Sequence, residues 1–282
     1  RVAGVSMATV SRVVNGNANV KEKTRQKVLE AIAELDYRPN AVARGLASKR
    51  TTTVGVILPT ITSTYFAAIT RGVDDIASMY KYNMILANSD NDVEKEEKVL
   101  ETFLSKQVDG IVYMGSSLDE KIRTSLKNSR TPVVLVGTID GDKEIPSVNI
   151  DYHLAAYQST KKLIDSGNKK IAYIMGSLKD VENTERMVGY QEALLEANIE
   201  FDENLVFEGN YSYEQGKALA ERLLERGATS AVVSHDTVAV GLLSAMMDKG
   251  VKVPEDFEII SGANSPITQY TYPTLTSVNQ PL

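Results

Sequence analysis

The sequence has no cysteine and no tryptophan, and its 282 residues include only two histidines, His153 and His235. Without cysteine the chain has no disulfide framework, no thiolate nucleophile and no cysteine-based zinc site. Two histidines are too few for a multi-histidine metal centre. These absences exclude most thiol and metal chemistry, and we expect neither a metal nor a cofactor.

Long apolar runs are absent as well. No stretch approaches the roughly 20 residues that a membrane-spanning helix needs, and residues 1–4 lack the layout of a signal peptide. The chain is 43% hydrophobic and 24% charged, which is typical of a folded protein with a full core. We therefore predict a cytoplasmic protein.

Charge is divided unevenly along the chain. Residues 1–50 hold ten basic and four acidic side chains, a net charge of +6, although the whole chain carries −6 at pH 7. Residues 51–282 therefore carry −12. A small basic module attached to an acidic body suggests that the module meets a polyanion, although a solvated basic surface fits the charge count equally well.

From Thr53 onward, short β-branched runs alternate with longer amphipathic stretches, which is typical of parallel βαβ units. We predict strands at 54–58, 83–87, 110–114, 133–136, 147–150, 170–174, 205–208, 231–234 and 258–260. We predict helices at 66–80, 93–106, 152–166, 186–197, 213–226 and 238–249.

About 230 residues of such units exceed one comfortable core, so we expect two similar lobes. The division falls near 149–151, giving a first lobe at 53–150 and a second at 151–280. Ligands of open α/β sheets bind at the carboxyl ends of the strands, so this arrangement predicts a small-molecule cleft between the lobes.

The first fifty residues differ in kind. Helical patterns cover 5–14 and 23–35, turn residues separate them, and a short Ala/Leu-rich helix is predicted at about 40–49. In the first helix, Thr9 and Arg12 lie near the start, where a recognition helix presents base-reading side chains to the major groove. Met7 and Ala8 suit thymine methyl groups, although the segment alone also fits an ordinary amphipathic helix.

The sequence resembles the lactose-repressor/galactose-repressor family of bacterial transcription regulators. The resemblance runs through the whole chain and rests on motifs that occur together and in order. These motifs are residues 5–16, Tyr37-Arg38-Pro39-Asn40, Ala43-Arg44-Gly45-Leu46 with Lys49, the first strand at 53–57, Asp151, Arg186 with Gly189-Tyr190, and His235-Asp236 before Ala239 and Gly241.

The resemblance implies a two-lobed, periplasmic-binding-protein-like α/β body, preceded by a small all-α helix-turn-helix DNA-binding domain at 1–50 with a hinge helix. In the family, two protomers meet on the operator as a homodimer and the hinge leucine, matching Leu46, wedges into the minor groove. It also implies that the chain begins inside the first helix of the DNA-binding domain and lacks C-terminal segments. The DNA-binding residues implied are Ser6, Met7, Ala8, Thr9, Arg12, Asn19, Tyr37, Arg38, Asn40, Ala43, Arg44 and Leu46.

Three segments, 43–49, 79–83 and 107–110, are similar to the branch of the family that regulates carbon catabolite repression and activation in Gram-positive bacteria. That branch responds chiefly to a protein, HPr phosphorylated on serine, with fructose 1,6-bisphosphate or glucose 6-phosphate as adjuncts. The resemblance places co-regulator docking at Asp75, Met79 and Tyr80, although their spacing also fits core or dimer-interface residues.

The resemblance places an effector cleft at the lobe boundary. Sugar-binding members carry an aspartate in a Gly-aromatic-Asp run, but this chain has Gly262-Ala263-Asn264 there. Ala263 accepts no hydrogen bond from a sugar hydroxyl, which argues against a free sugar as the main inducer. Arg186 and Lys179 are candidate phosphate ligands, although surface salt bridges explain these two residues equally well. The expected cleft residues are Asp151, Arg186, His235, Asp236, Asn264 and Gln280.

Three other functions compete with this interpretation. A lactose/galactose-type repressor controlled by a small sugar or sugar phosphate belongs to the same family and shares its general motifs. A periplasmic sugar receptor shares the body but has no basic helical module at its start. An enzyme is disfavoured because the chain has no G-x-G-x-x-G, no phosphate loop and no G-x-S-x-G elbow.

Overall fold

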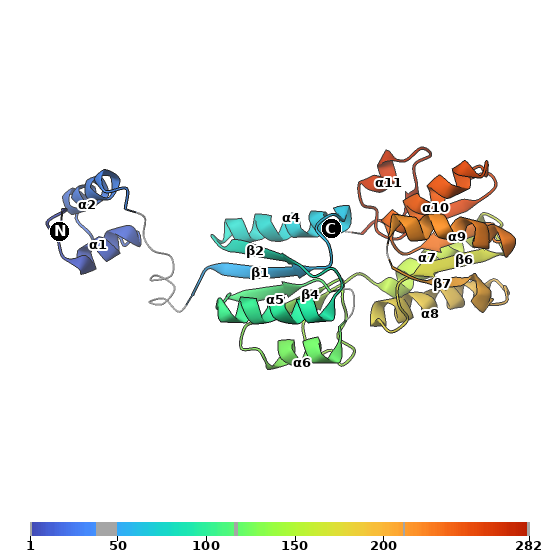
Figure 1. Ribbon diagram of the computed structural model, residues 1–282, viewed down its shortest axis with the longest axis horizontal. Coiled ribbons are helices and arrows are strands. Elements are labelled where there is room, and N and C mark those ends of the chain that lie inside the picture. The colour runs from blue at the N-terminus through green and yellow to red at the C-terminus, as the bar shows by residue number, and fades with distance from the viewer. Residues whose placement is uncertain (1, 38–49, 116–117, 211, 281–282) are drawn as a thin grey trace. The chain divides into compact units, whose positions relative to one another are not determined.

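The computed structural model describes residues 2–37, 50–115, 118–210 and 212–280. The chain divides into two compact units, which we call the headpiece (Arg1–Thr52) and the body (Thr53–Leu282) (Figure 1). The body holds two five-stranded sheets with every strand pair parallel, one sheet in each lobe. The predicted fold class is confirmed.

In the headpiece, two helices pack against each other. Helix α1 (Met7–Val14) begins after Ser6, whose side chain accepts a hydrogen bond from the Thr9 amide and so caps the helix. Helix α2 is Glu22–Glu34. Val13 of α1 and Val28 of α2 are buried, so the apolar sides of the two helices form the small core. The predicted hinge helix at about 40–49 lies outside the described residues.

The first lobe has a sheet in the order β2-β1-β3-β4-β5. Helix α4 covers one face of this sheet, and α5 and α6 cover the other (Figure 1). Alternate residues of β1 point to opposite faces: Val56 and Leu58 pack toward α4, whereas Ile57 packs toward α5 and α6. The elements are β1 (Thr53–Leu58), α4 (Thr64–Met79), β2 (Asn83–Asn88), α5 (Val93–Ser105), β3 (Gly110–Tyr113), α6 (Glu120–Asn128), β4 (Val133–Val136) and β5 (Ser147–Val148).

The second lobe repeats this plan with a sheet in the order β10-β9-β8-β6-β7. Ile171 and Tyr173 pack with α7 and α8, and Ala172 and Ile174 pack with α9 and α10. No helix of the described residues is long and apolar enough to cross a bilayer. The elements are α7 (Tyr152–Asp165), β6 (Ile171–Met175), α8 (Val181–Glu196), a 3₁₀ turn (Glu203–Leu205), β7 (Val206–Glu208), α9 (Tyr213–Glu225), β8 (Ser230–Val233), α10 (Asp236–Asp248), β9 (Glu258–Ser261), α11 (Ile267–Tyr270) and β10 (Thr276–Ser277).

All nine predicted strands of the body are present, but four short elements were not predicted: α6, the 3₁₀ turn, α11 and β10. Helix α6 buries only Ile122 and Leu126, one turn apart, which is too weak a pattern to distinguish from a loop. Helix α11 and strand β10 have four and two residues. Helix α8 begins at Val181, five residues before the predicted start at 186, and this extra turn contributes to the ligand cavity described below.

Helices α9 and α10 touch through glycine. A Cβ atom on Gly241 of α10 would lie 2.0 Å from the Tyr213 carbonyl oxygen, and one on Gly216 of α9 would lie 2.0 Å from the Val238 carbonyl oxygen. The two backbones therefore approach closely only because both positions lack a side chain. Gly189 of α8 has the same relation to the His153 carbonyl oxygen of α7, at 2.1 Å.

We expect Gly241→Ala to destabilise the body by about 1–3 kcal/mol, because the new methyl group forces α9 and α10 apart, an overpacking cost that exceeds alanine's gain in helix propensity. Gly72→Ala in α4 is the matched control, since nothing lies within 4 Å of its added Cβ. That change should stabilise the protein by up to about 1 kcal/mol. Urea unfolding of both variants measures the difference, and equal effects would contradict the close-contact explanation.

Candidate functional site

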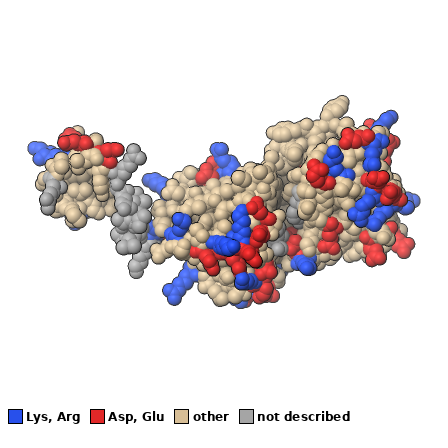
Figure 2. All heavy atoms as spheres, in the orientation of Figure 1, with Lys and Arg blue, Asp and Glu red and all other residues tan. Residues whose placement is uncertain are grey.

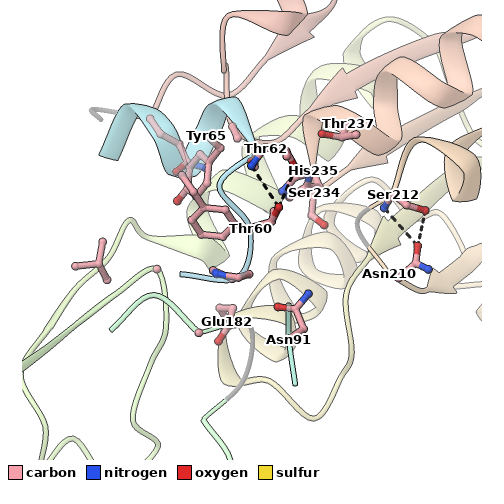
Figure 3. A pocket seen from close by; sticks show the side chains of 18 of the residues that line it. Thr60, Thr62, Tyr65, Asn91, Glu182, Asn210, Ser212, Ser234, His235 and Thr237 are labelled. Carbon is pink, nitrogen blue, oxygen red and sulfur yellow. Dashed lines mark hydrogen bonds between the residues drawn. The ribbon is translucent and has the colours of Figure 1, made fainter. Parts of the chain in front are cut away.

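A cavity of about 480 Å³ opens at the carboxyl ends of the strands in both lobes. Its lining comes from the loops that follow the strands: Pro59 and Thr60 after β1, Gly137 after β4, and Ser234 and His235 after β8. We call it the effector cavity (Figure 3). Its complete lining is Pro59, Thr60, Thr62, Ser63, Tyr65, Phe66, Asn91, Gly115, Val136, Gly137, Tyr152, Glu182, Arg186, Asn210, Ser212, Ser234, His235, Thr237, Ala263 and Gln280.

Charge in the effector cavity comes from helix α8. Among its lining residues, Arg186 and Glu182 are the side chains that can carry a full charge at neutral pH. The Arg186 guanidinium lies over the Tyr152 ring, 4.3 Å from its centroid, and donates a 3.2 Å hydrogen bond to the Asn183 Oδ1 atom. A stacked, hydrogen-bonded guanidinium that faces a cavity is suited to bind an anionic oxygen.

Glu182 has a different environment. Only 6% of the residue is exposed, and no hydrogen bond or ion pair joins its carboxyl group to another side chain of the described residues. Burial is the main reason that its pKa rises to about 7, with a further contribution from the neighbouring Asp180. The carboxyl group is therefore partly protonated at neutral pH.

Two further titratable groups of the cavity, His235 and Tyr65, are neutral. Burial lowers the pKa of His235 to about 4, so its imidazole carries no charge at pH 7. Burial also raises the pKa of Tyr65, so its phenol keeps its proton. The Ser234 Oγ atom is buried and has no hydrogen-bond partner within the described residues.

Three of the expected cleft residues line the effector cavity, namely Arg186, His235 and Gln280. The Gln280 amide donates a 2.7 Å hydrogen bond to the Gly262 carbonyl oxygen, which holds the segment after β10 against the loop after β9.

The other three expected cleft residues do not line the cavity. Asp236 is turned inward, where its carboxylate accepts hydrogen bonds from Ser261 Oγ, the Ala263 amide, and the amide and hydroxyl of Ser265. Asp151 caps α7 by accepting from the Leu154 amide at 2.7 Å, and Asn264 bonds to neighbouring side chains, Ser277 and Asn279. The side-chain oxygens of these three residues therefore hold neighbouring backbone and side chains in place. Lys179 is also absent from the lining and faces a separate groove.

Sequence reasoning missed Glu182 and several polar wall residues of the first lobe, including Thr60, Thr62 and Asn91. Thr60 and Thr62 are joined by a 2.8 Å hydrogen bond between hydroxyls. The sequence did contain one indication of the true start of α8. Aspartate is common just before a helix, and Asp180 would have moved the predicted start from 186 toward Val181. The inward orientation of Glu182 had no signal in the sequence.

The headpiece presents a polar, exposed face on α1. Met7 is 89% exposed, and Ala8 and Arg12 are exposed as well, whereas Val13 on the other side is buried. Ser6 bonds both the amide and the hydroxyl of Thr9. Asn19 lies exposed in the turn after α1, and Tyr37 is half exposed. The remaining expected DNA contacts, Arg38, Asn40, Ala43, Arg44 and Leu46, lie outside the described residues.

The expected docking residues lie at the end of α4 and are accessible in the single chain. Met79 and Tyr80 are each 70% exposed, so they are not core residues, and Asp75 forms a 3.0 Å ion pair with Arg71 one turn away. Tyr80 and Ile76 border a mainly apolar groove of about 660 Å³ along α4. Over the visible face of the body, basic and acidic side chains are mixed (Figure 2).

Comparison with known proteins gives the family. Residues 1–40 match bacterial regulatory proteins of the lacI family, and residues 51–280 match the periplasmic binding proteins and sugar binding domain of the LacI family. Catabolite control protein A of Streptococcus mutans is 55% identical over all of this chain and 85% of its own length. Catabolite control protein A of Priestia megaterium is 48% identical over all of this chain and 86% of its own length.

Solved structures agree. The lac repressor dimer bound to operator and the anti-inducer ONPF has a TM-score of 0.87 at 26% identity, covering 99% of this chain and 85% of that one. A complex of the transcriptional regulator CelR with cellobiose has a TM-score of 0.75 at 32% identity, covering 99% of this chain and 86% of that one. With a headpiece and a two-lobed body that both match, the chain belongs to the lacI family of bacterial regulatory proteins.

Proposed function

We propose that this chain regulates transcription in carbon catabolite control, binding operator DNA as a homodimer with serine-phosphorylated HPr as co-regulator. The observation that carries the proposal is the similarity over the whole of this chain, at 45–55% identity, to proteins named catabolite control protein A, in a chain that combines a helical headpiece with a two-lobed body. The effector cavity then takes a sugar phosphate as an adjunct.

The headpiece supports the DNA-binding part. Arg12 and Met7 lie exposed on a capped helix, and residues 1–50 carry a net charge of +6. An exposed arginine fork is suited to guanine, and net positive charge attracts the phosphate backbone. The body carries −12, so it adds little attraction of its own to DNA.

The cavity supports a phosphate-bearing adjunct better than a free sugar. Arg186 supplies a cation on the wall, whereas Ala263 supplies no side-chain acceptor where sugar-binding relatives have an aspartate. The exposed Met79 and Tyr80 support a protein partner, because Tyr80 borders an apolar groove and exposed methionine and tyrosine side chains are typical of interface cores.

A second candidate function is a repressor controlled by a small sugar alone. The CelR complex with cellobiose favours it, because this structural relative matches nearly the whole chain and binds a disaccharide. Operator binding by the full-length protein, measured at two salt concentrations with and without serine-phosphorylated HPr, separates the two. An operator affinity that is unchanged by the phosphoprotein but falls when cellobiose is added would favour the sugar-controlled repressor.

We expect Arg12→Ala to lower the preference for cognate over random DNA by about 1–3 kcal/mol, through loss of a bidentate contact to one base. Arg12→Lys is the matched variant, since it keeps the charge but loses the fork. It should lose most of the same preference while binding random DNA with nearly unchanged affinity and salt dependence. Competition gel shifts measure both quantities. Equal losses on cognate and random DNA would assign Arg12 to the backbone instead.

We expect Met79→Ala and Tyr80→Ala each to weaken binding of serine-phosphorylated HPr about tenfold, because both substitutions remove exposed apolar area from one patch. Operator binding without the phosphoprotein should not change. Leu195→Ala is the control: Leu195 is equally exposed, at 76%, but lies on α8 in the second lobe. Surface plasmon resonance with immobilised protein measures the affinities. If all three variants bind HPr like the original protein, the partner docks elsewhere.

A further inference from the structure

Glu182 forms no ion pair with a described residue, although its position on α8 would allow one. It precedes Arg186 by four residues on α8, and a glutamate and an arginine at this spacing commonly form an ion pair on one helix face. Here the guanidinium is instead stacked on Tyr152 and bonded to Asn183. The carboxyl group of Glu182 therefore has no countercharge of its own, although the residue is more than nine-tenths buried.

The surroundings of Glu182 are predominantly acidic. Besides the effector cavity, it borders a groove of about 390 Å³ where first-lobe residues meet the turn before α8. The basic side chain of the first lobe in that groove, Arg123, already contacts four carboxylates, those of Glu120, Asp140, Asp142 and Glu144. The charged and titratable groups that surround Glu182 are Asp180, Glu185 and Arg186 around its own helix, Lys179 in the preceding turn, Asp119, Glu120, Arg123, Asp140 and Asp142 in the groove, and Tyr65, Tyr152 and His235 in the cavity.

In Figure 3, Glu182 and Asn91 lie in the lower part of the cavity, apart from Tyr65, His235 and Thr237 in the upper part. An ionised Glu182 would repel any anion attracted by Arg186, because both side chains line the same cavity. A neutral Glu182 would instead offer an O–H donor beside that arginine, and two donors suit one anionic group.

We propose that Glu182 acts as a neutral carboxylic acid in the effector cavity and donates a hydrogen bond to an oxygen of the bound ligand, so that an anionic ligand binds together with a proton. The ligand class is a sugar phosphate, and in this respect the inference rests on the proposed function. Burial raises the pKa of Glu182 to about 7, so the coupling operates near neutral pH. Affinity is highest below this pH and falls as the pH rises above it.

The test is calorimetric titration of the full-length protein with glucose 6-phosphate at about pH 7 and about pH 8.5, in two buffers of different ionisation heat. The phosphate, with a pKa of about 6, is mostly dianionic over this range. The original protein should take up protons on binding and lose about tenfold in affinity at the higher pH. Glu182→Gln keeps an N–H donor without the titration, so it should bind with little pH dependence and without that proton uptake.

Glu185→Gln is the matched control, because Glu185 lies on the same helix but borders a different groove. It should keep most of the pH dependence of the original protein, because the charge of Glu185 affects the pKa of Glu182 less than the charges of Asp180 and Arg186 do. If Glu182→Gln shows the same proton uptake and the same loss of affinity as the original protein, the proposal is wrong.

A measurement without ligand separates this inference from the proposed function. A carboxyl group whose pKa is raised by folding, here from 4.5 to about 7, binds more protons in the folded state, so stability declines as pH rises between those values. Glu182→Gln removes the titrating group, so this decline is absent from the variant. The melting temperature of the variant, relative to that of the original protein, should therefore increase from pH 5 to pH 8. If glucose 6-phosphate binds neither protein at any pH, the sugar-phosphate adjunct fails. The melting temperatures then decide. A difference between Glu182→Gln and the original protein that grows with pH supports a neutral Glu182 carboxyl group, and a difference that stays constant overturns it.

Discussion

The site depends on one constraint, the parallel orientation of every strand pair in both sheets. Parallel strands end at the same edge of a sheet, so the loops that follow them collect there. Pro59 follows β1, Gly137 follows β4, and His235 follows β8, and all three line one cavity although they are far apart in sequence. The helices cover the sheet faces and supply most of the core. The loops at the strand ends are thereby free to carry polar side chains.

The same constraint explains how much of the fold could be predicted. Strands buried on both faces read as continuous apolar runs, such as residues 171–175, and all nine predicted body strands are present. Helix α6 was missed because Ile122 and Leu126 are its only buried residues. The start of α8 was misplaced because Val181 is the only apolar residue among the first six of the helix, so the apolar periodicity becomes visible only at Met187.

The site was only half predictable for a related reason. The sequence and the family resemblance led to the loops after β8 and β9, but neither says which way a side chain points. His235 and Asp236 are neighbours, yet His235 lines the cavity, and Asp236 turns inward to bind the loop at 261–265. Asp236 satisfies backbone amides that lack partners in that loop, so the geometry of the loop, not the polarity of the residue, decides its orientation.

Asp140, Asp236 and Glu182 all have buried carboxyl groups, but these groups have two different roles. Burial opposes ionisation of Asp140, but the Arg123 guanidinium and the amides of residues 142, 144 and 145 outweigh it and lower its pKa to about 2. Asp236 likewise accepts four hydrogen bonds.

Glu182 accepts a hydrogen bond from its own backbone amide but forms no ion pair with a described residue, so burial prevails and destabilises the charged form of its carboxyl group. A residue that served stability alone would be better replaced by an apolar side chain of similar size. The acid at this position is therefore better explained by what enters the cavity than by the fold around it.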